Sequence, residues 1–258
     1  MLLIDLKTKL NPDLYNVLEG EGINELRPCQ IKAIDRGVLD NKSLLVCTPT
    51  ASGKTLVAEF AGMQSILNKI GKAIYIVPLK ALANEKYKEF KRKYGHLCKI
   101  TISIGDLDKA EPYLQDYDLI ITTSEKLDSL LRHHSPWVKD VNTIIIDEIH
   151  LLNDVTRGPT LEIIITMLKR LLKNIQIIGL SATIGNPREL AEWLEAELIL
   201  DSWRPVELKH GIYLEGQINF FFQYSVFLLI ICLVFIHLSP FTYLFLKFIL
   251  YFINLFFV

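Results

Sequence analysis

Short apolar runs of strand length alternate with helix-like segments along most of this chain. The seven expected strands span residues 43–47, 72–77, 100–104, 118–122, 141–146, 175–180 and 198–200. Strands joined by helices are connected by right-handed crossovers, so this alternation predicts an α/β fold, a parallel sheet with helices on both faces. In such folds ligands bind beyond the carboxyl ends of the strands.

The first expected strand leads into the loop Thr48–Thr55, of sequence TPTASGKT, and a helix follows the loop. This context is typical of phosphate-binding loops, in which backbone N–H groups and the helix dipole face the phosphates. Lys54 would reach the outer phosphates and the Thr55 hydroxyl would bind Mg²⁺, so a nucleoside triphosphate is the expected ligand. Thr48 replaces the first glycine of the usual pattern, and an ordinary turn with a solvated lysine is the alternative. Nucleotide binding is assigned to the whole loop: Thr48, Pro49, Thr50, Ala51, Ser52, Gly53, Lys54 and Thr55.

An acidic pair, Asp147-Glu148, directly follows the expected strand 141–146. A carboxylate at the end of a buried strand is well placed to hold Mg²⁺ on the far side of the same nucleotide, which is the role expected of Asp147. Glu148 would polarise the attacking water as a general base, so the catalytic set is Glu148, Asp147 and Lys54. Two acids in a solvated loop are the alternative, and the order of strand, loop and acidic pair favours catalysis.

Two helix starts are predicted from local signals. Pro28, in the segment LRPCQ, is suited to a first helical turn. Gln30 is either a plain polar residue of that turn or, because it shortly precedes the phosphate loop, part of the nucleotide site. Asn186, Pro187 and Glu189 predict a second helix that begins with a capping box.

Charge and cysteine content restrict the class of partner and the compartment. The formal net charge is −1, which argues against a nucleic-acid footprint over the whole surface and favours a local patch. Basic residues gather in the expected helix 79–94, where a solvated helix face is the alternative to direct nucleic-acid contact. Four cysteines without metal-binding spacing and an N-terminus without a secretory signal favour a reducing, cytoplasmic location.

The last forty residues differ sharply in composition from the rest. Residues 219–258 hold eleven of the thirteen phenylalanines, a single formal charge at Lys247, and no alanine or glycine. Residues 224–238 and 241–258 approach the length of membrane spans. The alternative is a frameshifted or truncated product. It is favoured because helices in membranes pack through small residues, and this segment has no alanine or glycine. The expected organisation is an N-terminal segment 1–25, an ATP-binding domain 26–216 and an apolar tail 217–258.

Several ordered motifs resemble one family. These motifs are LRPCQ, TPTASGKT, VPLKALANEK, Gly105-Asp106, TSEKLDSLLR, DEIH, GLSATIGNP and ELAEWL, spread over about residues 26–205. Together they resemble the first RecA-like domain of superfamily 2 DExH-box helicases, and specifically look like the archaeal Ski-like DNA repair helicases related to the helicase domain of polymerase theta. This family tolerates a residue other than glycine at the position of Thr48.

The resemblance implies an ATP-dependent DNA helicase that uses ATP and Mg²⁺ and binds single-stranded or forked DNA. Gln30 would read the adenine edge. His150, Ser181 and Thr183 would couple the nucleotide state to the nucleic-acid path. The strand backbone would be contacted without base specificity by Pro78, Leu79, Lys80, Ala81, Thr123 and Lys126.

The same resemblance implies that parts of the machine lie outside this sequence. Helicases of this class close two RecA-like lobes around ATP, and the second lobe supplies arginines worth about 10³ to 10⁵ in rate. The expectation is therefore an ATP-binding lobe that is inactive alone, with the second lobe encoded by the same gene or a downstream frame. Two other functions stay open: a nucleotide-binding module without turnover, and a P-loop protein anchored to a membrane through residues 219–258.

Overall fold

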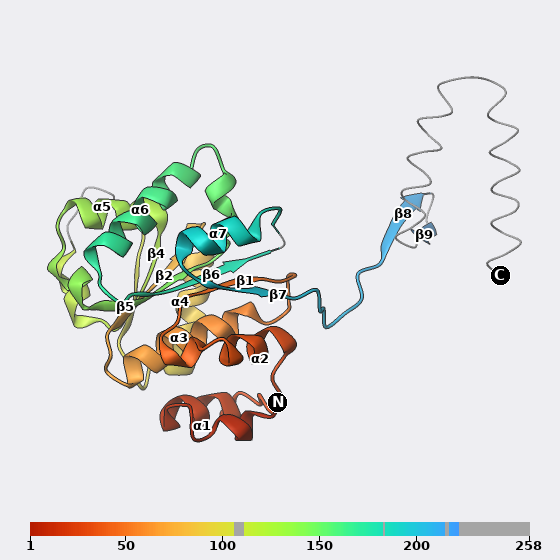
Figure 1. Ribbon diagram of the computed structural model, residues 1–258, viewed down its shortest axis with the longest axis horizontal. Coiled ribbons are helices and arrows are strands. Elements are labelled where there is room, and N and C mark those ends of the chain that lie inside the picture. Colours follow the sequence, from red (N-terminus) through yellow and green to blue (C-terminus); the bar gives the residue numbers. More distant parts are fainter. Residues whose placement is uncertain (106–110, 183, 215–216, 222–258) are drawn as a thin grey trace, which may run out of the picture. The chain divides into compact units, whose positions relative to one another are not determined.

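The computed structural model describes residues 1–105, 111–182, 184–214 and 217–221. The chain divides into two compact units, Met1–Pro205 and Val206–Val258. The first unit is an α/β domain, and the described part of the second is an antiparallel hairpin (Figure 1). Everything that the sequence predicts for catalysis falls in the first unit.

Seven parallel strands form the sheet of the first unit, in the order β3-β4-β2-β5-β6-β1-β7. The strands are β1 (Leu44–Cys47), β2 (Lys72–Val77), β3 (Ile100–Ser103), β4 (Leu119–Thr123), β5 (Val141–Ile146), β6 (Gln176–Ser181) and β7 (Glu197–Leu200). The α-helices are α1 (Pro12–Gly20), α2 (Pro28–Asp35), α3 (Lys54–Leu67), α4 (Lys80–Tyr94), α5 (Ser124–Arg132), α6 (Gly158–Leu171) and α7 (Pro187–Leu194). Short 3-10 helices are η1 (Leu3–Leu6), η2 (Val38–Asp40), η3 (Pro112–Asp116), η4 (Pro136–Asp140) and η5 (Ile149–Asn153).

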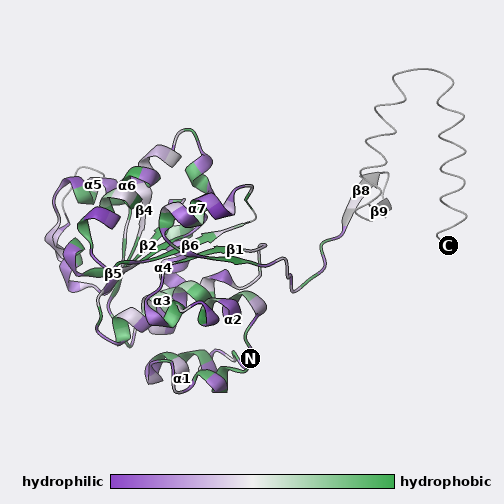
Figure 2. Ribbon diagram, viewed as in Figure 1, coloured by the Kyte–Doolittle hydropathy of each residue, from purple (hydrophilic) through white to green (hydrophobic). Residues whose placement is uncertain are grey.

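Helices cover both faces of the sheet, with α1, α2 and α3 on one face and α5, α6 and α7 on the other (Figure 1). Side chains of adjacent strand residues point to opposite faces, so Tyr75 packs in the core beneath α3 and α4, whereas Ile74 and Ile76 pack in the core beneath α5 and α6. The strands are almost uniformly hydrophobic, as Figure 2 shows, because a parallel sheet covered on both faces has no solvated side. This confirms the predicted α/β fold.

The strand bounds agree with the sequence prediction to within about one residue at most ends, and those of β2 and β5 agree at both ends. Helix α6 begins at Gly158 and ends at Leu171. Residues 1–25 form η1 and α1, whose buried leucines Leu6, Leu14 and Leu18 belong to the main core. The N-terminal segment is therefore part of the first compact unit, which runs to Pro205.

The capping box expected at Asn186 does not form. The Asn186 side chain makes no cap hydrogen bond to the backbone, and its Nδ2 instead donates to Glu189 Oε2 at 3.2 Å. Asn186 has φ −125° and ψ 55°, so the backbone enters α7 at an angle that pairs the two side chains with each other. The helix begins at Pro187 as predicted.

In the second unit, β8 (His210–Leu214) pairs with β9 (Gln217–Phe221). The boundary expected between residues 216 and 217 thus falls within this hairpin, and the unit boundary lies at Pro205–Val206. The two apolar stretches 224–238 and 241–258, on which the membrane interpretation depends, lie outside the described residues. Among the helices of the described ranges, none combines the length and hydrophobicity that a membrane crossing needs.

Candidate active site

The phosphate loop connects β1 to α3 and is held by hydrogen bonds of its own. Thr48 N donates to Ser181 O of the neighbouring strand at 3.2 Å, and the Thr48 and Ser52 hydroxyls share a hydrogen bond of 2.7 Å. Gly53 has φ +96°, and a Cβ there would lie 2.4 Å from Gln30 Nε2, so glycine is required on both grounds. Ala51 also has a positive φ of 65°. These bonds hold the loop in a conformation that suits the glycine at position 53 and strains the backbone of Ala51.

Gln30 reaches this loop from the first turn of α2. Its Nε2 donates to Gly53 O at 3.0 Å, and its Oε1 accepts from Arg27 N at 2.8 Å. The side chain is buried, and its bond to Arg27 N is the capping bond of a first-turn polar residue, so Gln30 fills that role while also contacting the loop. Arg27 braces the same loop through a 2.6 Å bond from Nη1 to Ala51 O, and its guanidinium lies 5.8 Å from the Trp203 ring centroid. No role for Arg27 was expected from the sequence.

Lys54 is bonded within the loop and lies close enough to the acidic pair to be influenced by its charge. Its ammonium donates to Thr48 O at 2.8 Å. Burial lowers the pKa of Lys54, while the negative charges of Glu148 and Asp147 act in the opposite direction and favour the ammonium. The structure therefore brings together the lysine and the acidic pair that the sequence assigned to one site.

Asp147 directly follows β5, with its N–H donating to Ile76 O at 2.8 Å. The hydroxyl of Tyr75, from the neighbouring strand, donates to Asp147 Oδ2 at 3.2 Å, and Glu148 N donates to Oδ1 at 3.1 Å. Burial is the main reason that the pKa of Tyr75 lies well above its usual value, so Tyr75 remains a hydrogen-bond donor. The carboxylate is thereby held in one orientation beside the phosphate loop.

Glu148 adopts a left-handed backbone conformation, with φ 51° and ψ 47°. This conformation is uncommon for a residue with a side chain and is found preferentially at functional sites. His150 Nδ1 lies 3.2 Å from Glu148 Oε2, in a position that does not satisfy hydrogen-bond geometry. The buried Ser181 hydroxyl also lacks a hydrogen-bond partner among the described residues. Thr183 lies outside the described residues.

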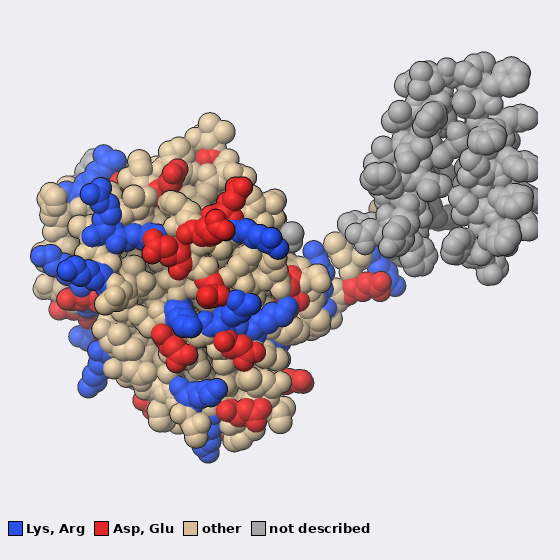
Figure 3. Space-filling model, viewed as in Figure 1, with Lys and Arg blue, Asp and Glu red and all other residues tan. Residues whose placement is uncertain are grey.

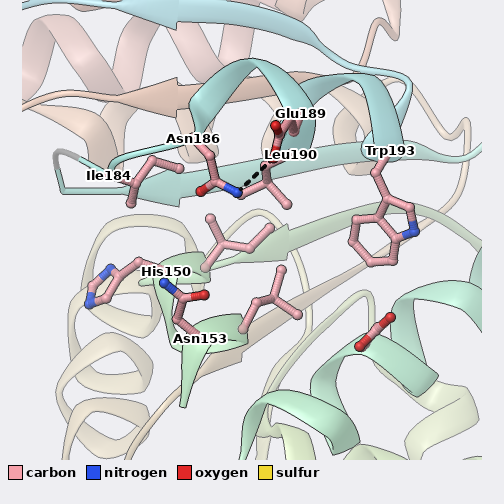
Figure 4. Close-up of a pocket in the computed structure, with 10 residues that line it drawn as sticks. His150, Asn153, Ile184, Asn186, Glu189, Leu190 and Trp193 are labelled. Carbon is pink, nitrogen blue, oxygen red and sulfur yellow. Dashed lines mark hydrogen bonds between the residues drawn. The ribbon is translucent and has the colours of Figure 1, made fainter. Parts of the chain in front are cut away.

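A cavity of about 240 Å³ opens beside His150, between η5 and the start of α7 (Figure 4). In this view His150 and Asn153 lie below Asn186 and Leu190, and Trp193 lies at the other end. The polar side chains around the cavity belong to loop ends and to exposed helix faces. The cavity therefore adjoins the site at His150 and does not include the phosphate loop.

A half-buried charge network contacts Thr55 of the loop and was missed from sequence. Lys86 Nζ lies 3.4 Å from Thr55 Oγ1 and pairs with Glu89 at 3.1 Å, and Glu89 in turn pairs with Lys93. Lys93 also pairs at 2.9 Å with Glu59, a buried residue of α3. Glu89 and Lys93 follow Lys86 by three and seven residues, so all three lie on one face of α4. This spacing is the sequence signal from which the network could have been predicted. These residues orient the helix that carries Thr55.

Two further segments from the sequence prediction follow adjacent strands. Residues 78–81 follow β2 and residues 123–126 follow β4, and the register pairs Val77 with Thr123. Leu79, Lys80 and Ala81 are exposed. Lys126 is fully buried and its ammonium pairs with Glu111 at 3.1 Å, so this side chain does not contribute to the exposed surface. Its burial follows from its place on the inner face of α5.

Charge over the visible surface is mixed. On the face of the first unit shown in Figure 3, basic and acidic side chains are interspersed. This pattern matches the net charge of −1 and favours a local contact region for any polyanion over an electrostatic footprint on this face. Among the described residues, no group of three or more His, Cys, Asp or Glu could hold a metal ion. A metal beside Thr55 and Asp147 would therefore need further ligands, such as phosphate oxygens.

The fold and the site define a class. A parallel sheet with a glycine-lysine-threonine loop after one strand and an acidic pair after another is a RecA-like P-loop domain. Residues 27–191 match the family model described as DEAD/DEAH box helicase, and the chain belongs to this family. This confirms the helicase resemblance expected from the motifs.

Particular relatives narrow the comparison. The chain is 58% identical over 216 residues to the ATP-dependent DNA helicase Hel308 of Methanocaldococcus jannaschii, covering 80% of this chain and 18% of that protein. It is 54% identical over 203 residues to Hel308 of Pyrococcus abyssi, covering 79% and 28%. The fold is similar, with a TM-score of 0.65 and 31% identity, to the helicase MrfA in its DNA-bound crystal structure, covering 75% of this chain and 30% of that chain. The chain thus spans less than a third of the length of each of these relatives.

Proposed function

We propose that this chain is the ATP-binding lobe of an ATP-dependent DNA helicase, which couples ATP hydrolysis to movement along single-stranded DNA. The observation that carries the proposal is the position of the Lys54 ammonium, bonded to the phosphate loop and within the field of Asp147 and Glu148. The names of the Hel308 relatives, which are ATP-dependent DNA helicases, support the same function.

In this proposal the loop 48–55 holds the phosphates of ATP. Its backbone N–H groups and the N-terminus of α3 favour negative charge, and Lys54 contacts the outer phosphates. Thr55 and Asp147 are the protein ligands that suit Mg²⁺, because a hydroxyl and a carboxylate are hard oxygen donors. When bound, Mg²⁺ neutralises charge that develops on the phosphate oxygens. Tyr75 keeps the Asp147 carboxylate oriented toward the loop.

Glu148 is the proposed general base, which accepts the proton of the attacking water. Its left-handed backbone conformation, directly before η5, is of the uncommon kind found preferentially at functional sites. Gln30 is the proposed adenine contact, because its amide retains one N–H and one oxygen lone pair beyond the bonds to Gly53 and Arg27. Adenine offers a matching acceptor and donor at N7 and N6.

His150, Ser181 and Thr183 are proposed to couple the nucleotide state to the nucleic-acid path. The proposal is supported for His150 and Ser181 by polar atoms that lack hydrogen-bond partners and so remain available to a changed conformation. Residues 78–81 and Thr123 are proposed to contact the sugar-phosphate backbone of single-stranded or forked DNA. Lys126 is wholly buried, backbone included, so it takes no part in the proposed contact.

A second RecA-like lobe, from the same gene or a separate polypeptide, is proposed to complete the ATP site. An arginine from such a lobe stabilises transition-state charge in this class of motor. We therefore propose that the chain alone binds ATP but turns it over little. A cytoplasmic location, supported by the three free cysteines of the described residues, is part of the same proposal.

Two substitutions in the full chain separate binding from hydrolysis. We expect Lys54→Ala to weaken binding of a fluorescent ATP analogue in the presence of Mg²⁺ by about ten- to a hundredfold, because charge-assisted hydrogen bonds contribute about 1.5–3 kcal/mol. Glu148→Gln is expected to bind the analogue like the natural protein and to slow single-turnover hydrolysis by about 10² to 10⁴. Lys139→Ala, which removes an exposed lysine of η4, is the control. Equal loss of binding in the Lys54 and Glu148 variants would show that the roles are misassigned.

A further inference from the structure

Arg157 joins three segments that the sequence separates widely. It precedes α6, and its guanidinium donates to the carbonyl of Pro78, after β2. The same side chain donates from Nε and Nη2 to Glu125 Oε1 at 2.9 and 2.8 Å. Pro78 and Glu125 lie in the two segments proposed to contact DNA. Arg157 itself lies only four residues beyond η5, which begins directly after Glu148.

The turn that carries Arg157 is rigid. Asp154 Oδ1 accepts hydrogen bonds from Thr156 N at 2.9 Å, Thr156 Oγ1 at 2.6 Å and Arg157 N at 2.9 Å. The Thr156 hydroxyl bond is the main cause that lowers the pKa of Asp154 below its ordinary value, so the carboxylate is charged at neutral pH. A Cβ on Gly158 would lie 2.2 Å from Leu152 O, which shows how closely the start of α6 packs on η5. A shift of η5 would therefore move Arg157 with it.

Arg157 also lies near the catalytic aspartate. A small pocket is lined in common by Pro78, Ser124, Asp147 and Arg157. Asp147 N is bonded to Ile76 O, two residues before Pro78. The residue that follows β5 and the two segments beyond β2 and β4 thus line one small pocket, together with the side chain of Arg157.

The ion pair between Arg157 and Glu125 is weak enough for its geometry to change. The Arg157 and Glu125 side chains are 28% and 39% exposed, so solvent screens their ion pair and its breakage costs little folding stability. Burial raises the pKa of Glu125, but its own backbone N–H, Arg157 and Thr123 outweigh burial and hold the pKa below its usual value. The pair is therefore ionised at neutral pH, and its geometry can change without leaving a buried charge unpaired.

We propose that Arg157 is a positioning residue that couples the nucleotide at Asp147 and Glu148 to the affinity of residues 78–81 and Thr123 for single-stranded DNA. This inference rests on the proposed function, and it adds to the coupling residues His150, Ser181 and Thr183 a side chain outside the sequence motifs. Movement of η5 with the nucleotide state would shift the guanidinium, and with it the Pro78 carbonyl and the start of α5.

The test compares three variants of the full chain. The dissociation constant of a fluorescein-labelled oligothymidylate is measured by anisotropy with and without Mg²⁺ and a non-hydrolysable ATP analogue, and the ratio is the coupling factor. Arg157→Ala should bring this ratio closer to one by about two- to thirtyfold, the range seen for residues that transmit coupling. Arg157→Lys should lose most of the effect, because an ammonium cannot hold Pro78 and Glu125 in a fork. Arg132→Ala removes an exposed arginine of α5, paired only locally with Asp128, and is the control for lost charge.

A second readout separates failure of this inference from failure of the proposed function. Amide hydrogen exchange is followed in residues 78–83 and 124–128 when the ATP analogue is added. If the natural chain binds no DNA, the proposed function fails, yet nucleotide-dependent protection that Arg157→Ala abolishes would still support the positioning role. The inference is overturned if Arg157→Ala keeps the natural coupling factor and protection, or if exchange in these segments ignores the nucleotide in the natural chain.

Discussion

The ammonium of Lys54 experiences two opposing influences. Burial favours its neutral form, and the charges of Glu148 and Asp147 favour its ionised form, with burial the stronger. A phosphate binds the ammonium and not the neutral amine. The charge state of this one residue therefore sets an upper pH limit for nucleotide binding.

We predict that ATP affinity falls at alkaline pH, starting below the usual lysine pKa of about 10.4. Bound phosphate raises the pKa of Lys54, so affinity is constant below the pKa of the free protein and falls as pH rises above it, by at most about tenfold per pH unit. The check is the dissociation constant of an ATP analogue from about pH 7 up to the usual lysine pKa of about 10.4, because the decline should begin below that value. Lys54→Arg keeps its charge over this range and should lack the decline. A similar decline in that variant would point to another titrating group.

Residue roles could be predicted where chemistry is local in sequence. The phosphate loop and the acidic pair were predicted to share one site because each directly follows a strand of the same sheet, and this shared site stays a prediction. Arg27 and Arg157 were missed because their partners, Ala51 for one and Pro78 and Glu125 for the other, are set by folding and not by spacing. Lys126 was expected from the family resemblance to contact the nucleic-acid backbone, but it is buried and pairs with Glu111, a partner that local sequence does not indicate.

At the scale of elements, the junction between η5 and α6 depends on Gly158. The helix start approaches the Leu152 carbonyl so closely that no side chain fits without movement. This contact fixes where α6 begins and so the position of Arg157. It also explains why the residue at the start of α6 is a glycine.

We predict that Gly158→Ala destabilises the protein by about 1–3 kcal/mol, the usual cost of overpacking. Gly20→Ala is the matched control, because Gly20 ends α1 with no atom within 4 Å of an added Cβ. The control should be neutral or stabilising by up to about 1 kcal/mol. Urea unfolding monitored by circular dichroism gives both values. Equal stability of the two variants would mean that η5 and α6 yield easily at this contact.

Strand positions were predictable because a covered parallel sheet requires largely apolar runs, as in residues 73–77 of β2 and 144–146 of β5. The strand order was not, because β1 pairs with β6 and β7, and nothing local to β1 specifies those partners. The capping box at Asn186 failed for a related reason. The backbone angle at a helix entry depends on the preceding loop as well as on residue type.

At the scale of the whole molecule, both hydrophobic cores lie within the unit Met1–Pro205. Each core covers one face of the sheet, and every strand of the sheet belongs to this unit. The described strands of the second unit pair only with each other. Among the described residues, the seven-stranded sheet and both of its cores therefore lie before Val206.

We predict that a fragment of residues 1–205 folds alone and unfolds in one cooperative transition. Its thermal midpoint, measured by circular dichroism, should not change with the protein concentration, because the cores need no partner. The same fragment with Phe60→Ala is the control, since a cavity at this buried residue should lower stability by about 3–5 kcal/mol. Broad, non-cooperative melting of the unsubstituted fragment would contradict the prediction.

The distant pairing of β1 also bears on protein synthesis. The loop 48–55 leaves the ribosome early, but the strands that flank β1 begin pairing at Ile178 and Glu197. At about 5–20 residues per second, the nascent chain exposes this apolar strand on the order of ten seconds before its neighbours exist. A nascent chain is therefore unable to form the ATP site until it is nearly as long as the first unit, and chaperones have that interval in which to bind it.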